Sequence, residues 1–203
     1  MGKNIGLIPL GFTEIWSASF NSAIIISAGD NAEFIAFCGI NLDITIFNKE
    51  NVYLPAFLKT YPFLNVEVEN KDKKVNSLIA IDNNPKYVAK DKKIFILDKE
   101  KNLSKQVATK VELIKELNSQ RAVCRRIIAE LKKLDLLIKK GLRVKIEGKE
   151  EKVILEEFYV INMEKLLKLD DKIIASFAKK GWMGIFDAHL KSISNFEKIL
   201  KAN

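Results

Sequence analysis

The feature of this chain that most constrains its fold is a change in hydrophobic period near Asn102. Beyond that residue, apolar side chains recur in steps of three and four, the pattern of one face of an α-helix about thirty residues long. The positions that keep this spacing are Leu103, Val107, Val111, Ile114, Leu117, Cys124, Ile128, Leu131, Leu134 and Ile138. Gly141 follows them and predicts the end of the helix.

Before this helix, the sequence predicts short strands separated by turns. Residues 22–27 and 32–38 are apolar runs on either side of Ala28-Gly29-Asp30-Asn31, and we expect them to form a hairpin. Apolar residues at helical spacing predict a short helix over residues 52–61, which Pro62 ends. Further strands are expected over residues 64–69, 78–81 and 94–97, and residues 82–85 have the composition of a turn.

After the long helix, residues 142–146 and 153–160 predict a second hairpin with its turn at 148–151. Asn162 and Asp170 are expected to cap helices over residues 163–169 and 173–180, with Gly181 ending the second. A last helix is expected over residues 182–200. The sequence thus predicts an α+β fold in a single domain, residues 1–203. It would have antiparallel strands and hairpins in the N-terminal half and at 142–161, one long central helix and C-terminal helices.

The charge of the chain bears on its partners. The 203 residues include 34 Lys and Arg against 26 Asp and Glu, a formal net charge of +8. Most of the cations are lysines scattered beside acidic residues, which is typical of a solvated surface, whereas nucleic-acid interfaces favour arginine. The arginines are Arg121, Arg125, Arg126 and Arg143. We therefore expect no nucleic-acid partner.

Location and redox chemistry follow from the apolar segments and the cysteines. Gly6 and Pro9 interrupt the apolar N-terminal stretch, which is too short for a signal-peptide core. No apolar run approaches the roughly 18–20 residues of a membrane span, so we expect a cytoplasmic protein without membrane insertion. Cys38 and Cys124 are expected to be buried thiols. One histidine and two separated cysteines supply too few ligands for zinc, and the sequence indicates no cofactor or metal.

Five short motifs occur in register along the chain. They are Tyr53-Leu54-Pro55-Ala56-Phe57-Leu58-Lys59-Thr60-Tyr61-Pro62-Phe63; Leu78-Ile79-Ala80-Ile81-Asp82 with Pro85; Arg121 with Cys124 and Ala129-Glu130-Leu131; Glu157-Phe158-Tyr159-Val160-Ile161-Asn162; and Gly181-Trp182 with Ala188-His189-Leu190, Ser192 and Asn195. Together they resemble the bacterial SapC family over roughly Phe20 to Leu200. Thr60 stands where the family usually has a basic residue, and Asp187 where it often has Tyr.

The resemblance implies a SapC-like accessory protein associated with bacterial surface-layer protein loci and their export machinery. The family has no established catalytic activity, so a noncatalytic role is the implied one.

His189 is the only histidine, and it shares helical spacing with apolar residues of the last expected helix, such as Phe186 and Ile193. We therefore expect its ring to be buried, with a backbone or side-chain hydrogen-bond partner. The alternative is proton transfer or ligand binding, which would require a pKa displaced by burial and a charged neighbour.

Arg121 interrupts the apolar face of the long helix with a permanent charge. One interpretation is an ion pair with a carboxylate such as Asp82 or Glu157, or a guanidinium that reaches the surface. The other is that Arg121 binds the carboxylate of a ligand or peptide. Asn195 could line the same pocket as His189 only if the last helix loosens, because six residues of helix place it about 120° away.

Tyr61 and Asp82 are further candidate ligand-binding residues. Tyr61 belongs to an aromatic cluster with Tyr53, Phe57 and Phe63. Such a cluster is a peptide-docking surface or part of the core, and we favour the core.

From the sequence we favour a noncatalytic protein- or peptide-binding accessory. One alternative is an enzyme that uses His189 as general acid or base and Arg121 to bind an anionic substrate. A second alternative is a nucleic-acid binder driven by the positive charge.

Overall fold

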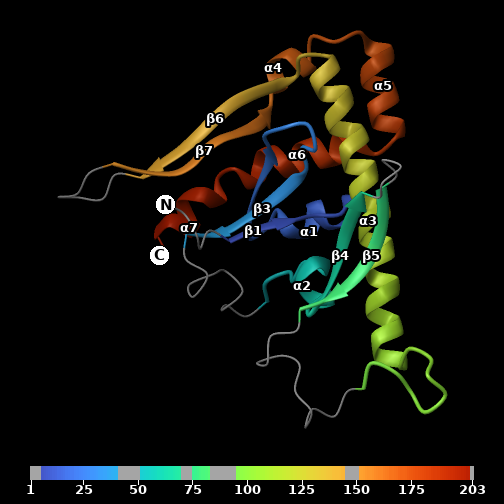
Figure 1. Ribbon diagram of the computed structural model, residues 1–203. Coiled ribbons are helices and arrows are strands. Elements are labelled where there is room, and N and C mark those ends of the chain that lie inside the picture. The colour runs from blue at the N-terminus through green and yellow to red at the C-terminus, as the bar shows by residue number, and fades with distance from the viewer. Residues whose placement is uncertain (1–5, 41–50, 70–74, 83–94, 145–150, 202–203) are drawn as a thin grey trace. The chain divides into compact units, whose positions relative to one another are not determined.

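The computed structural model describes residues 6–40, 51–69, 75–82, 95–144 and 151–201. Its backbone contacts form two units, which are described separately below: unit 1 contains residues 1–55 and 120–203, and unit 2 contains residues 56–119. The predicted α+β class is confirmed, with antiparallel sheets, a long central helix and C-terminal helices (Figure 1). The assignment of residues 1–203 to one domain stays a prediction.

The sheet of unit 1 has five antiparallel strands in the order β1-β3-β2-β7-β6. Their bounds are β1 Gly6–Pro9, β2 Ala23–Ser27, β3 Phe34–Gly39, β6 Leu137–Val144 and β7 Lys152–Ile161. Both predicted hairpins are confirmed, and Gly29 adopts a φ of 96° in the turn of the first. Four successive residues of β2, Ala23 to Ile26, are buried, which requires that both faces of this strand be covered.

The helices of unit 1 pack around this sheet. They are the 3-10 turn η1 Phe12–Glu14, α1 Ile15–Ala18, the second part of α3, α4 Met163–Leu166, α5 Asp171–Lys179, α6 Trp182–Ser192 and α7 Asn195–Lys201. Two predicted caps are confirmed, since side chains of Asn162 and Asp170 accept hydrogen bonds from the backbone of Lys165 (3.1 Å) and Lys172 (2.8 Å). Gly181, with a φ of 73°, separates α5 from α6.

The long helix α3 spans Lys105–Lys133 and ends before the predicted point. Asp135 adopts a φ of 54°, and the Leu136 N–H donates to the Leu131 carbonyl at 2.9 Å, which closes the last turn. Ile138 therefore lies in β6, although its spacing continues the helical pattern. Gly141 does not end the helix: it lies at an irregularity of β6, where a Cβ atom would meet the Glu156 carbonyl oxygen at 3.0 Å.

The expectation of one last helix over residues 182–200 is wrong, because α6 and α7 are separate. Between them, the Ile193 N–H donates to Leu190 O and the Phe196 N–H to Ile193 O, short-range bonds that replace the regular α-helical ladder. Ser192 also donates from its hydroxyl to the His189 carbonyl at 2.6 Å. The helix thus ends at Ser192, and α7 begins at Asn195.

Unit 2 contains a two-stranded hairpin, a short helix and the first part of α3. The hairpin pairs β4 Phe63–Glu69 with β5 Val75–Ile81, and the short helix is α2 Ala56–Thr60. An apolar core cluster of the unit, among its described residues, contains Phe63, Val107 and Ile114, with Ile81 and Val111 packed against them. The Lys110 ammonium donates to the carbonyls of Lys59 (2.6 Å) and Tyr61 (3.0 Å), so it ties α3 to the segment between α2 and β4.

Some other expectations differ from the structure or lie outside the described residues. The helix expected over residues 52–61 is confined to α2, because the residues before Ala56 are not helical. No strand forms over Phe95 to Leu97 beyond one bridge between Leu97 and Leu103, and Phe95 is exposed. Ile94, most of the turn expected over residues 82–85, Ile146 and most of the turn at 148–151 lie outside the described residues.

None of the helices in the described residues has both the length and the apolar character needed to span a bilayer.

Candidate functional site

The predicted burial of His189 is confirmed, and its role in unit 1 becomes clear from the sheet. The β2 and β7 strands pair only at Ile26 with Tyr159 and Ser27 with Phe158. Two residues further along each strand, Ile24 would face Ile161 in the same register, but side chains of α6 lie between the strands there. The Ile161 N–H donates to His189 Nε2 at 3.2 Å, and the Ile24 N–H donates to Ser192 Oγ at 2.9 Å. We call this place the β2–β7 gap.

The environment of the His189 ring disfavours its charged form. The residue has 0% exposure, and burial lowers the pKa of its imidazole from 6.5 to about 4, an effect that the backbone of Ile24 partly opposes. Because Nε2 accepts a hydrogen bond, the neutral ring carries its proton on Nδ1, which completes no hydrogen bond with the described residues. A neutral, fully enclosed imidazole is suited to accepting the Ile161 N–H, and no substrate could touch it unless unit 1 opened locally.

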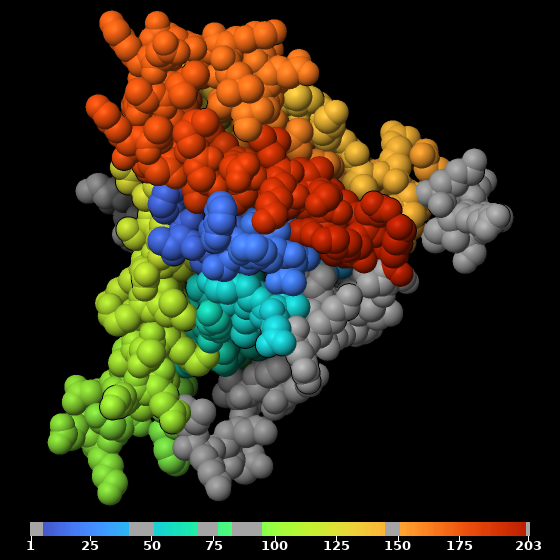
Figure 2. All heavy atoms as spheres, turned by 180° about the vertical axis from the view of Figure 1, so that it is seen from behind, coloured from blue at the N-terminus to red at the C-terminus, as the bar shows by residue number. Residues whose placement is uncertain are grey.

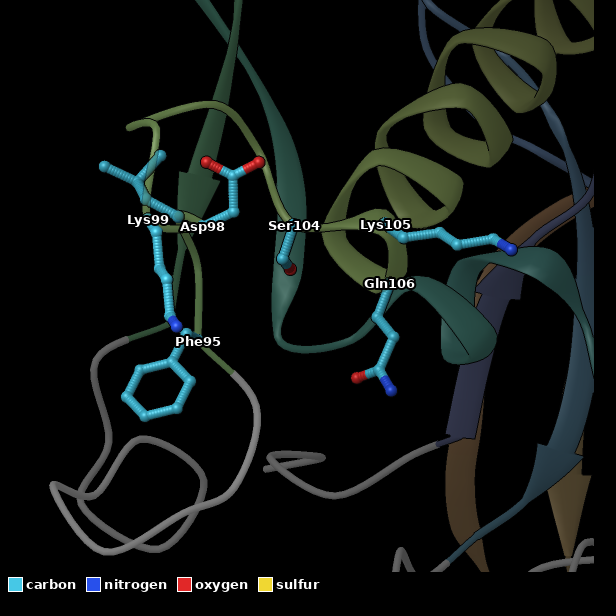
Figure 3. Close-up of a pocket in the computed structure, with 7 residues that line it drawn as sticks. Phe95, Asp98, Lys99, Ser104, Lys105 and Gln106 are labelled. Carbon is cyan, nitrogen blue, oxygen red and sulfur yellow. The ribbon is translucent and has the colours of Figure 1, made fainter.

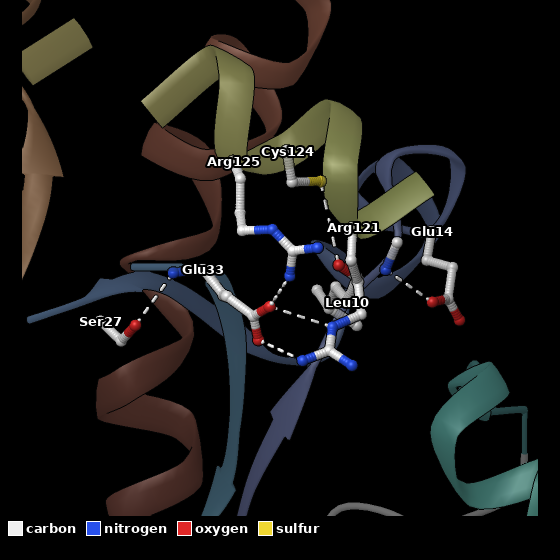
Figure 4. A network of polar contacts seen from close by, with 8 residues as sticks. Leu10, Glu14, Ser27, Glu33, Arg121, Cys124 and Arg125 are labelled. Carbon is white, nitrogen blue, oxygen red and sulfur yellow. Dashed lines mark hydrogen bonds and ion pairs between the residues drawn. The ribbon is translucent and has the colours of Figure 1, made fainter. Parts of the chain in front are cut away.

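Arg121 pairs with Glu33, so the partners proposed from the sequence, Asp82 and Glu157, are wrong (Figure 4). Its Nε and terminal nitrogen donate to the two carboxylate oxygens of Glu33 at 3.1 and 2.7 Å. Arg125 donates to the same carboxylate at 2.9 Å. Glu33 lies 88 residues before Arg121, and no periodicity joins the two. The guanidinium fork that a ligand carboxylate would need is therefore filled by an internal one.

The carboxylates expected to pair with Arg121 have other partners. Glu157 forms an ion pair with Lys139 and accepts from the Tyr159 hydroxyl at 2.7 Å, and Lys139 lowers the pKa of this carboxyl below its usual value. In unit 2, Asp82 accepts a hydrogen bond from the Tyr61 hydroxyl. The structure thus brings together two of the candidate residues, Tyr61 and Asp82, at the base of the β4–β5 hairpin.

Asn195 lies at the start of α7 and is buried. Its side-chain amide donates to the carbonyls of Ser19 (2.8 Å) and Ser22 (3.0 Å), which follow α1. These bonds satisfy carbonyl groups at the end of a helix and fasten α7 to the segment that leads into β2.

The aromatic cluster predicted around Tyr61 is divided between the two units. Phe63 is part of the unit 2 core, as favoured from the sequence.

Tyr53 belongs to unit 1, where its hydroxyl donates to the buried carboxylate of Glu14 at 2.9 Å. Burial, with Glu14 as a further cause, raises the pKa of Tyr53 well above its usual range. The Glu14 carboxylate also accepts the Gly11 N–H at 2.8 Å. The three-residue spacing of Gly11 and Glu14 is the one feature of the sequence that could have indicated this bond.

Both cysteines are buried free thiols, as expected. Burial raises the pKa of Cys38 and of Cys124 to about 12, so neither thiol forms a reactive thiolate at neutral pH. Among the described residues there is no group of three or more His, Cys, Asp or Glu side chains that could hold a metal ion.

A hollow of about 640 Å³ lies in unit 2 where α3 begins (Figure 3). Its lining residues are Phe95, Leu97, Asp98, Lys99, Ser104, Lys105 and Gln106. The Asp98 carboxylate accepts the N–H groups of Glu100 (2.9 Å) and Asn102 (3.0 Å). This acidic group thus holds together the turn that precedes α3.

Comparison with known proteins places the chain in a family. The sequence profile described as SapC matches residues 1–199. No curated protein and no solved structure gives a match. The profile covers almost the entire chain and confirms the resemblance carried by the five motifs: this protein belongs to the SapC family.

Proposed function

We propose that this protein is a noncatalytic, cytoplasmic accessory of surface-layer protein production or export, and that it binds a protein or peptide partner. Membership of the SapC family supports the association with surface layers. The observation that carries the binding role is an exposed aromatic pair at α1, Trp16 and Phe20, with exposed fractions of 49% and 53%.

Buried neighbours in sequence hold the aromatic pair in place. Ile15, Ala18 and Ser19 are buried, so α1 is anchored on the body of unit 1 while Trp16 and Phe20 face outward. The two rings meet edge to face with centroids 6.2 Å apart. An anchored aromatic pair loses little conformational entropy on binding, and aromatic side chains are enriched among residues that dominate protein interfaces.

The surroundings of this pair belong to the same unit. The Lys191 ammonium of α6 lies 4.7 Å from the centre of the Phe20 ring. Seen from behind, the surface of the N-terminal segment borders that of the C-terminal helices (Figure 2). A partner docked on Trp16 and Phe20 would therefore also meet α6 and its lysine.

Both residues of the enzyme alternative, His189 as acid or base and Arg121 as substrate-binding residue, have structural partners, which supports the binding role over that alternative. His189 is enclosed and accepts a backbone N–H, and Arg121 is paired with Glu33.

A photo-crosslinking experiment in the native cell tests this function. A benzophenone amino acid at position 20 should capture a discrete partner. The same probe at Leu167, a residue that is 65% exposed and follows α4, is the matched control. The partner, identified by mass spectrometry and purified, should bind the Trp16→Ala/Phe20→Ala variant at least about 30-fold more weakly than wild type, since aromatic hot spots contribute about 2 kcal/mol or more. Equal binding by the variant would refute the proposal that the partner binds to Trp16 and Phe20. A partner unrelated to surface-layer proteins or their export would refute the proposed process.

A further inference from the structure

A groove of about 660 Å³ runs along unit 1 where α3 passes the junction of α5 and α6. Its walls are Val123, Arg126, Ala129 and Glu130 of α3 together with Lys180 and Trp182. None of the residues discussed above as candidate sites lines it. Its chemistry is mixed: an apolar surface and an indole ring lie beside two cations.

The indole is held firmly. Trp182 stacks on Phe177 with ring centroids 5.4 Å apart and an angle of 27° between the planes. Phe177 is buried and packs edge-on against the buried Phe186 at 5.6 Å. The Lys180 ammonium lies 4.7 Å from the centre of the Trp182 ring. Trp182 is thus held in a fixed position at the wall of the groove, where its indole can contact an apolar side chain of a ligand.

Positive charge continues from this groove along α5. A second hollow of about 520 Å³ is lined by Lys172, Ala175, Ser176, Lys179 and Lys180, so the two hollows share Lys180. Positions 172, 176 and 179 lie on one face of the helix, and the small side chains at 175 and 176 leave space between the lysines. The acidic groups nearby in sequence are Asp170 and Asp171, at the start of α5.

The cations of this surface have no acidic partner within the described parts of the chain. Arg126, Lys172, Lys179 and Lys180 form no ion pair there, whereas Arg121 and Arg125 share the carboxylate of Glu33. Of the described residues that line the two hollows, Glu130 alone is acidic. Four cations against this single carboxylate make the surface complementary to an anionic partner.

We propose that this surface, which we call the cationic groove, binds an acidic peptide segment that carries one large apolar residue. The apolar side chain would lie against Trp182, Val123 and Ala129, and flanking carboxylates would meet Arg126 and the lysines of α5. Glu130 would repel the continuous phosphates of a nucleic acid but can accept N–H groups of a peptide. A single arginine and a single aromatic ring also differ from the repeated stacking platforms of single-strand binders. The inference goes beyond the proposed function and does not use Trp16 or Phe20.

Fluorescence anisotropy with a defined probe tests the cationic groove. The probe is a fluorescein-labelled peptide Gly-Asp-Glu-Phe-Glu-Asp-Gly at an ionic strength of about 0.15 M. It should bind the wild-type protein and shift the indole N–H resonance of Trp182. Two control probes should each bind at least about tenfold more weakly: a peptide with Ser in place of Phe, and an oligothymidylate of the same charge. A tenfold change corresponds to the loss of one hydrophobic contact or one charge-assisted hydrogen bond.

Variants locate the binding. Arg126→Glu/Lys180→Glu, which changes side chains at the surface of the groove, should weaken binding of the probe at least about tenfold. Lys198→Glu, an exposed lysine of α7, should leave it unchanged. Absence of probe binding, equal binding by the charge-reversed variant, or tighter binding of the oligothymidylate would overturn the inference. Trp16→Ala/Phe20→Ala should bind the probe normally, so failure of the cationic groove and failure of the proposed function are told apart.

Discussion

His189 and Ser192 lie one turn apart on α6, and each accepts a backbone N–H from one of two strands that have separated, Ile161 in β7 and Ile24 in β2. The two side chains thus replace the ladder bonds that the β2–β7 gap interrupts. A buried backbone N–H without a partner costs about 1–3 kcal/mol, so this arrangement accounts for a fully buried histidine without a catalytic role.

Replacing the ring should therefore destabilise the protein. His189→Ala leaves the Ile161 N–H without an acceptor and opens a cavity, and we expect a loss of about 3 kcal/mol or more in the free energy of unfolding. Urea denaturation followed by circular dichroism measures it. Asp187→Ala, at an exposed position of the same helix, is the control and should change the value by less than about 0.5 kcal/mol. A His189→Ala protein as stable as this control would contradict the structural role.

The same ring predicts a dependence of stability on pH. The pKa of His189 is lowered to about 4 in the folded protein and is near 6.5 in the unfolded chain, so the unfolded state binds the extra proton. Stability should fall as the pH decreases from about 6.5 to about 4, by up to about 3 kcal/mol from this group. His189→Gln removes the titrating group, and its unfolding free energy should vary less over that range. Parallel pH profiles for the two proteins would rule out the explanation.

The carboxylate shared by Arg121 and Arg125 should be important for folding. Glu33 is 12% exposed in its side chain, and an amide in place of this carboxylate would leave the two guanidinium groups with one acceptor oxygen and no negative charge. We expect Glu33→Gln to lower the free energy of unfolding by about 1–3 kcal/mol. Glu197→Gln, in a largely exposed pair with Lys201, should cost no more than about 0.5 kcal/mol. Thermal and urea melts of both variants give the comparison, and equal effects would show that the Glu33 pairs add little.

Two glycines should respond to alanine with opposite signs. At Gly141 a Cβ atom would lie 3.0 Å from the Glu156 carbonyl oxygen and 3.4 Å from that of Leu155, both backbone atoms of β7. Gly141→Ala should thus destabilise the protein by about 1–3 kcal/mol. Gly184 lies within α6, and a Cβ atom there would have no neighbour within 4 Å beyond its own stretch of helix, so Gly184→Ala should stabilise the protein by about 0.5–1 kcal/mol. Urea melts of the two variants measure both changes. A destabilised Gly184→Ala protein would mean that the exposed side of α6 is tighter than the structure indicates.

Local sequence signals predicted many of the elements. The first hairpin follows from an isoleucine-rich run beside Gly29, and the caps at Asn162 and Asp170 follow from side chains that bond to a backbone N–H two or three residues later. The burial of His189 follows from its helical spacing. In each case the signal behind the prediction lies within a few residues of the chain.

The errors have two causes, turn geometry that apolar spacing does not register and contacts between distant residues. Apolar spacing continues through Ile138, but the left-handed Asp135 closes α3 and sends that residue into β6. The division of α6 from α7 involves bonds from Ser192 to Ile24 and from Asn195 to Ser19 and Ser22, more than 160 positions away. The cationic groove joins α3 to the α5–α6 junction, and no periodicity of the sequence relates Arg126 to Lys180.

The β2–β7 gap has a consequence for the order in which the chain can fold. Strands β1, β3 and β2 form one group and β6 with β7 another, and only two residue pairs connect them directly. The side chains that bond to both groups at the β2–β7 gap belong to residues 189 and 192. During synthesis on the ribosome, both groups of strands emerge before His189 and Ser192 do. The five-stranded sheet would therefore reach its final form only when α6 has been released.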